Sequence, residues 1–135
     1  MTTVFFYGLF MDEHLLKQKG LNPESIRLAC LDGYQLRIGE RATLVPHRGM
    51  SSYGAVMRLS QRELEQLYSS DGVEDYVPDS VQVRVINDEL VDAVTYVLPI
   101  ERILGSNSEY AVKLAHTAEA LGLPSAYVDE IKGWT

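Results

Sequence analysis

The stretch Val4-Phe5-Phe6-Tyr7-Gly8-Leu9-Phe10-Met11 joins two sequence patterns. Residues 4–7 are β-branched or aromatic and show no helical period, which is typical of a short strand buried on both faces. Gly8 interrupts the run, and residues 11–17 then take on helical character. A strand that turns at a glycine into a helix directs several backbone N–H groups the same way, and such a corner can bind a carboxylate or an oxyanion. The simpler alternative, favoured by this stretch alone, is that Gly8 only permits a tight turn.

The length and composition of the chain are those of an ordinary globular protein. The 135 residues are 46% hydrophobic and 23% charged, which predicts a single domain over residues 1–135. Twelve Lys and Arg stand against nineteen Asp and Glu, giving a formal net charge of -7. Because nucleic acids and anionic membranes require a basic face, we expect neither as a partner.

The single cysteine and the hydropathy pattern bear on the cellular compartment of the protein. Cys30 has no second cysteine with which to form a disulfide, and it lies in an apolar run, so we expect it in the core. No apolar segment approaches the roughly 18 residues of a membrane span. The first residues lack the positive region and cleavage site of a signal peptide. We therefore expect a cytoplasmic protein, while the oligomeric state is not indicated.

The middle of the chain favours short strands. Residues 25–38 are expected to form two extended pieces with a bend or bulge at Asp32-Gly33. Residues 41–46 form a further strand, residues 47–52 a loop, and residues 53–59 the next strand.

The later part supplies the clearest helices. Ser60 and Glu63 form a capping box, and the helix that they open is expected to stop at Gly72. Strands follow at residues 81–85 and 90–98, paired as a hairpin. A second capping box over residues 106–109 opens a helix that ends at Gly122, and Pro124 begins a last helix that carries Tyr127 and Ile131.

Together these elements amount to six or seven strands and three or four helices that do not strictly alternate, which predicts the α+β class. So many short strands in a small chain indicate a strongly coiled or closed sheet.

Few residue patterns in the chain carry chemistry by themselves. His14, His47 and His116 lack metal-ligand spacing, and neither a phosphate loop nor a nucleophile elbow is present, so we expect no metal and no cofactor. His47 could reach a pocket from its loop, although exposed loop histidines usually have no such role.

Asp71 is of interest because it follows the C-terminal end of the helix that begins after Ser60. The negative end of the helix dipole and burial beside apolar neighbours would both raise the pKa of a carboxyl group, towards the range of a general acid/base. The competing interpretation, favoured by the local sequence, is an ordinary Asp-Gly turn.

The chain holds eight tyrosines against three phenylalanines. Tyrosines at inward-facing positions of their elements are expected mostly in the core, with a minority lining a small polar cavity. They are Tyr7, Tyr68, Tyr96, Tyr110 and Tyr127.

A series of short segments resembles the γ-glutamylcyclotransferase-like family, which includes γ-glutamylamine cyclotransferases and the plant AIG2-like proteins. Its Tyr-Gly-Ser/Thr-Leu motif is matched by residues 7–10, its Ala-Thr-Leu-Val-Pro segment by residues 42–46, and its Gly-x-Val strand by residues 54–59. Its Leu-Asp-x-x-Glu-Gly helix end corresponds to residues 67–72, followed by Tyr76. The Ala-x-x-Tyr-Val strand and the Gly-Leu-Pro-x-x-Tyr tail are matched by residues 93–97 and 122–127.

The resemblance implies a small closed mixed β-barrel flanked by helices. It also implies a cyclotransferase that releases 5-oxoproline from a γ-glutamyl amine or γ-glutamyl dipeptide. Asp71 would occupy the catalytic acid/base position, and the substrate would be bound by Tyr7, Gly8, Leu9, Phe10 and Tyr76. The leaving amine would be selected by loops such as residues 47–52 and 100–106.

Two departures from the family pattern fall within this site. Asp71 replaces Glu, which withdraws the carboxylate by about 1 Å, and Leu9 replaces Ser or Thr. Glu74 or Asp75 could supply the carboxylate instead. The alternatives to an enzyme are therefore a barrel that binds a small molecule without reaction, or a protein-interaction domain that uses its acidic surface.

Overall fold

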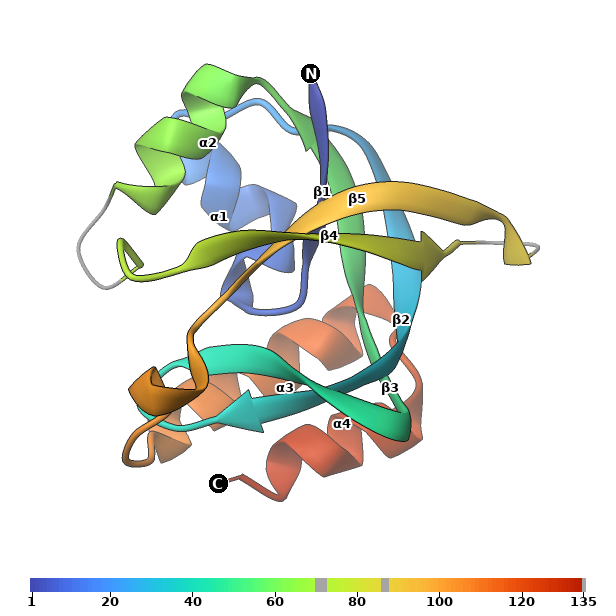
Figure 1. Ribbon diagram of the computed structural model, residues 1–135, viewed down its shortest axis with the longest axis vertical. Coiled ribbons are helices and arrows are strands. Elements are labelled where there is room, and N and C mark those ends of the chain that lie inside the picture. Colours follow the sequence, from blue (N-terminus) through green and yellow to red (C-terminus); the bar gives the residue numbers. More distant parts are fainter. Residues whose placement is uncertain (70–72, 86–87, 135) are drawn as a thin grey trace.

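The computed structural model describes residues 1–69, 73–85 and 88–134, which form a closed β-barrel with helices outside it (Figure 1). The described strands are β1 (Thr2–Phe6), β2 (Glu24–Ile38), β3 (Ala42–Leu59), β4 (Val77–Arg84) and β5 (Leu90–Val97). The helices are α1 (Glu13–Gln18), α2 (Gln61–Tyr68), α3 (Ser108–Leu121) and α4 (Ser125–Lys132), with short 3-10 helices η1 (Leu9–Met11) and η3 (Ile100–Arg102).

The barrel is mixed, with strand order β1-β3-β2-β4-β5. Antiparallel ladders join β1 to β3, β3 to β2 and β4 to β5, while β5 returns parallel to β1 at Val4 and Val94. The predicted α+β class and closed mixed barrel with flanking helices are therefore confirmed. Residues 4–6 are buried as expected, and β1 is a barrel strand paired with β3 on one side and β5 on the other.

The long β2–β3 ribbon corrects the prediction of a loop at residues 47–52. In the structure β3 runs through these residues, and Asp32 pairs with Ser51 while Tyr34 pairs with Pro46. The predicted bulge near Asp32-Gly33 is present as a register shift. The segment resembled a loop because it is polar, and it is polar because much of it is exposed on the bulged part of the ribbon. The described residues consequently form five strands, rather than six or seven.

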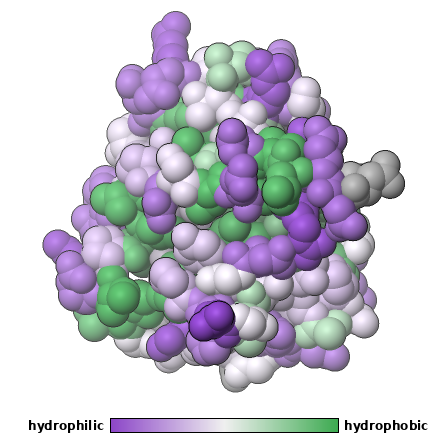
Figure 2. Space-filling model, turned by 45° about the vertical axis from the view of Figure 1, so that its right-hand side comes forward, coloured by the Kyte–Doolittle hydropathy of each residue, from purple (hydrophilic) through white to green (hydrophobic). Residues whose placement is uncertain are grey.

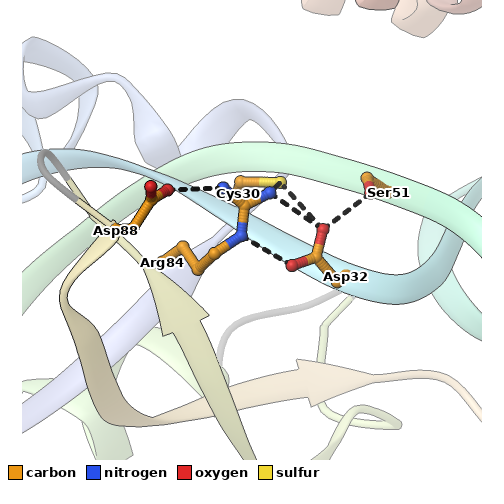
Figure 3. A network of polar contacts seen from close by, with 5 residues as sticks. All are labelled: Cys30, Asp32, Ser51, Arg84 and Asp88. Atoms are coloured by element: carbon orange, nitrogen blue, oxygen red, sulfur yellow. Dashed lines mark hydrogen bonds and ion pairs between the residues drawn. The ribbon is translucent and has the colours of Figure 1, made fainter.

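A polar cluster joins β2 to β4 (Figure 3). In the described ladders these strands share one register pair, Cys30 with Arg84. Arg84 donates to Asp32 through Nε at 2.7 Å and Nη2 at 3.0 Å, and Ser51 donates to the same carboxylate at 2.8 Å. The guanidinium of Arg84 also pairs with Asp88 at 3.1 Å. Hydrogen bonding to Arg84 lowers the pKa of Asp32 to about 2. Cys30 is buried, as expected.

Helix caps decide where the later helices begin. Ser60 and Glu63 form the predicted capping box, with Glu63 N donating to Ser60 Oγ at 3.1 Å and Ser60 N donating to Glu63 Oε1 at 2.9 Å. The predicted stop at Gly72 lies outside the described residues. The predicted second capping box is wrong, because Asn107 is the N-cap and accepts from Tyr110 N at 3.0 Å.

The ends of α3 and α4 agree with the sequence. Gly122 ends α3 in the left-handed conformation at φ 82°, and α4 begins directly after Pro124. Tyr127 and Ile131 are buried against the core, and Tyr127 meets Tyr53 of β3 with ring centroids 5.1 Å apart. Helix α4 thus packs against the β2–β3 ribbon.

The surface carries scattered apolar residues. On the face in Figure 2, apolar side chains form separate patches between hydrophilic ones. Exposed apolar residues come from different elements, among them Leu28, Leu90 and Ile100. Singly exposed apolar residues of this kind are normal and need no partner. In the described part of the chain, no helix combines the length and apolarity needed to cross a membrane.

Candidate functional site

Gly8 forms a corner between β1 and η1. Met11 N donates to Gly8 O at 3.0 Å, and Asp12 N donates to Leu9 O at 3.1 Å. Gly8 has φ −103° and ψ −157°, a conformation open to any residue. A Cβ added at Gly8 would lie 2.6 Å from Tyr110 Oη. The glycine is therefore required by the close approach of Tyr110, rather than by backbone conformation.

A cavity of about 340 Å³ opens beside this corner. Its volume lies at the lower end of the range for small-molecule sites. Five of the residues that line it are tyrosines from five separate segments. The lining residues are Phe6, Tyr7, Gly8, Leu9, Phe10, Leu15, Lys19, Arg41, Ala42, Tyr68, Val73, Tyr76, Tyr96 and Tyr110.

Tyrosine hydroxyls fix the walls of the cavity. Tyr7 Oη donates to Tyr96 O at 2.5 Å, and Tyr76 Oη donates to Ala42 O at 2.5 Å. Tyr110 Oη accepts from Leu9 N at 3.3 Å and so ties α3 to the corner. These bonds connect β1 to β5, the start of β4 to β3, and α3 to η1.

Burial also sets the protonation of these tyrosines. It raises the pKa of Tyr110 to about 12 and the pKa of Tyr7 and Tyr68 well above the usual value. At neutral pH the hydroxyls are therefore protonated and serve as hydrogen-bond donors rather than as bases.

Two cations line the otherwise aromatic and apolar cavity. The guanidinium of Arg41 lies 5.8 Å from the ring centroid of Tyr76, and Lys19 Nζ lies 5.9 Å from that of Phe10. Arg41 Nη2 also pairs with Asp75 Oδ2 at 3.4 Å. Among the described lining residues there is no carboxylate.

The structure gathers five of the sequence-predicted site residues around one cavity: Tyr7, Gly8, Leu9, Phe10 and Tyr76. Asp71 lies outside the described residues, although Val73, two positions later, lines the cavity. Asp75 is held by Arg41 and by Arg102 at 3.8 Å. Neither Glu74 nor Asp75 belongs to the lining.

Several expectations about the cavity walls need correction. Neither residues 47–52 nor residues 100–106 line the cavity, contrary to expectation. His47 is exposed on β3 and does not line the cavity, in agreement with the favoured interpretation that it has no site role. Tyrosines expected mostly in the core line it instead, namely Tyr68, Tyr96 and Tyr110 beside Tyr7. The choice of Tyr over Phe at inward positions was the signal available in the sequence.

Sequence reasoning missed Lys19 and Arg41, because a lone lysine at a helix end and a lone arginine after a turn resemble ordinary surface residues. In the described ranges, no group of three or more His, Cys, Asp or Glu side chains could hold a metal ion.

Comparison with known proteins identifies similar chains. The sequence model of the AIG2-like family matches residues 51–131. No curated protein matches the sequence. The fold is similar to that of a γ-glutamyl cyclotransferase, with 19% identity over 99% of this chain and 88% of that chain and a TM-score of 0.82.

Two further structures share the fold. A glutathione-specific γ-glutamyl cyclotransferase from yeast is 14% identical over 98% of this chain and 94% of that chain, with a TM-score of 0.72. An AIG2-like protein from Mus musculus is 16% identical over 92% of this chain and 84% of that chain, with a TM-score of 0.61. At these identities the likeness concerns the fold alone.

Proposed function

The chain belongs to the AIG2-like family, and we propose that it is a γ-glutamyl cyclotransferase that releases 5-oxoproline from a γ-glutamyl amine or γ-glutamyl dipeptide. The observation that supports the proposal is the cavity beside the Gly8 corner, which Gly8, Leu9 and Phe10 line together with the partly buried Tyr110. The shared fold with γ-glutamyl cyclotransferases supports it.

The reaction needs few protein groups. The α-amine nitrogen of the substrate attacks its own γ-carbonyl carbon, a C–N bond closes the five-membered ring, and the bond to the leaving amine breaks. One proton passes from the attacking nitrogen to the departing nitrogen. An attack within one molecule already has a high effective molarity. The protein therefore has to hold the folded conformer, transfer the proton and stabilise the oxyanion.

The corner supplies the groups for binding and for oxyanion stabilisation. In the proposed complex, the backbone of Gly8, Leu9 and Phe10 faces the γ-glutamyl group, with Tyr7 and Tyr76 as neighbouring walls. Because Tyr110 Oη accepts the Leu9 N–H, its own O–H is the donor that it can offer to a ligand. That hydroxyl compensates for the alcohol that Leu9 lacks.

Asp71 is proposed as the acid/base. It precedes the cavity-lining Val73 by two residues and would carry the proton between the two nitrogens. Release of 5-oxoproline from a panel of γ-glutamyl amines and dipeptides tests the activity. Asp71→Asn should lower kcat/KM by roughly 10²- to 10⁴-fold, the range of general acid–base catalysis.

Glu74→Gln is the matched control, since Glu74 is exposed and lies three residues away. It should retain activity. Undiminished turnover by the Asp71→Asn variant would remove Asp71 from the role, and loss of turnover in the Glu74→Gln variant would transfer the role to that carboxylate.

A binding barrel without chemistry is the second candidate, and it is favoured by the presence of Asp, rather than the longer Glu, at position 71. Its signature would be calorimetric binding of a γ-glutamyl compound with no 5-oxoproline after long incubation. An interaction domain that uses the acidic surface would not require a cavity of about 340 Å³.

A further inference from the structure

We propose that the groove between α1 and α3 binds a small carboxylate with an apolar body. The groove is lined by His14, Leu15 and Gln18 of α1 and by Val112, Lys113 and His116 of α3. This site is distinct from the cavity beside the Gly8 corner, and the inference does not depend on the proposed cyclotransferase function.

The two helices line the groove with faces of the same spacing. The three α1 residues stand at positions i, i+1 and i+4 of their helix, and the three α3 residues have the same spacing. Residues three and four apart lie on one side of a helix, so each helix turns a single side to the groove. The space between them is about 410 Å³, within the range of small-molecule sites.

The groove and the cavity beside the Gly8 corner share a wall. Leu9 and Leu15 line both spaces. The other side chains differ, because the five cavity tyrosines do not line the groove and the two groove histidines do not line the cavity. The groove is therefore a second space with its own chemistry.

The polar groups of the groove are mostly donors without partners. Within residues 1–69, 73–85 and 88–134, the Lys113 ammonium and the imidazole rings of His14 and His116 form no hydrogen bond or ion pair. An ammonium group only donates, and an imidazole offers at least one N–H in either tautomer. These groups come from both helices, so they can approach one ligand from two sides.

The carboxylate among the described lining residues is already in use. Asp12 is the N-cap of α1 and accepts from His14 N at 3.0 Å. Its charge is thus placed at the positive end of that helix. In the described residues, no group of acidic, histidine or cysteine side chains could hold a metal ion, which leaves an anion as the complement of the donors.

One lysine matches a single negative charge. A phosphate group carries nearly two charges at neutral pH, whereas a carboxylate carries one. The carboxylate also has two acceptor oxygens, which can meet the ammonium and an imidazole N–H together.

The apolar residues of the groove favour a ligand with an apolar body. Val112 is 45% exposed, although it lies on the side of α3 that faces the groove. Leu9 and Leu15 are partly exposed beside it. A ring or branched chain that covers these side chains removes apolar surface from water, which stabilises the complex.

The test compares benzoate with benzyl alcohol, which share the ring and differ in the charge. The chain has three histidines, so the imidazole Cε1–Hε1 region of a ¹H–¹³C NMR spectrum should contain three signals. His14→Gln and His116→Gln each remove one signal and so assign it. His47 is exposed on β3 and does not line the groove, so its signal is an internal control.

Benzoate should shift the His14 and His116 signals in a saturable way and leave the His47 signal in place. Its dissociation constant should be lower than that of benzyl alcohol by roughly 10-fold, the lower end for a hydrogen bond to a charged group, because the groove is open to solvent. Absence of the shifts, an equal shift of His47, or equal affinity for the two compounds overturns the inference.

A charge-removing variant locates the effect. Lys113→Gln should bring the ratio of the two dissociation constants close to one. Arg62→Gln removes one positive charge from the exposed side of α2, outside the groove, and should keep the ratio. Retention of the ratio in Lys113→Gln, with an unchanged melting temperature, overturns the assignment of the carboxylate to this lysine.

Discussion

Adding one methyl group at Gly8 should disturb the candidate site. The Cβ of an alanine there would lie 2.6 Å from Tyr110 Oη, inside the contact distance. The backbone itself accepts alanine, because φ is −103°. The whole cost must therefore come from moving Tyr110, whose ring is packed in the cavity wall.

The magnitude follows from two terms. Overpacking costs about 1–3 kcal/mol, and a displaced Tyr110 hydroxyl deprives Leu9 N of its partner at 3.3 Å, at a cost of about 1 kcal/mol. Gly8→Ala should thus lower the free energy of unfolding by about 2–4 kcal/mol. It should also reduce turnover, since Tyr110 and the corner amides shift together.

A double-mutant cycle isolates the cause. Tyr110→Phe removes the oxygen that the methyl group would meet and should by itself cost about 1 kcal/mol. The double variant should be less destabilised than the sum of the two single variants by about 1 kcal/mol or more. Urea unfolding, followed by circular dichroism, measures all three. Additive losses, within about 0.5 kcal/mol, would refute the steric argument.

Three further results are expected. Thr43→Val should cost about 1–3 kcal/mol in urea unfolding, because buried Leu98 N loses its acceptor at 2.8 Å. The folded-state pKa of Asp32 lies below the unfolded value, so its stabilising effect is present above about pH 4 and is lost as the pH falls towards 2. Asp32→Asn should therefore lose less stability than the parent over that interval. Burial raises the pKa of Tyr110 to about 12, so part of the stability is lost as the pH rises from about 10 through 12, and Tyr110→Phe should lose less in alkaline unfolding titrations.

The fold class could be predicted because its signals are local. The capping box at Ser60, the glycine at position 122 and the alternating valines of β4 each act within a few residues. The incorrect prediction of a loop at residues 47–52 has a different origin. A polar segment forms a strand there because β2 pairs with it across a bulge, and pairing between distant segments leaves no local pattern.

In the candidate site, too, the contiguous residues could be predicted from the sequence and the distant ones could not. The Gly8 corner was predicted from a strand, a break and a helix start that are contiguous in sequence. Arg41 and Tyr110 reach the cavity only through the barrel topology and the return of α3, whereas Lys19 follows the corner at the end of α1. A basic residue at the end of α1 interacts favourably with the helix dipole, and this local effect accounts for Lys19 by itself. The sequence therefore contained no sign that Lys19 also lines the cavity.

The use of tyrosine rather than phenylalanine connects the fold to the candidate site. The hydroxyls of Tyr7 and Tyr76 donate to backbone carbonyls of Tyr96 and Ala42, so they hold the walls together. Hydroxyls committed in this way have no proton left to offer a ligand. Tyr68, Tyr96 and Tyr110 also line the cavity, and their hydroxyls are not among those that donate to these carbonyls. Two tyrosine hydroxyls thus hold the walls together, and the other three are polar groups that a substrate in the cavity can meet.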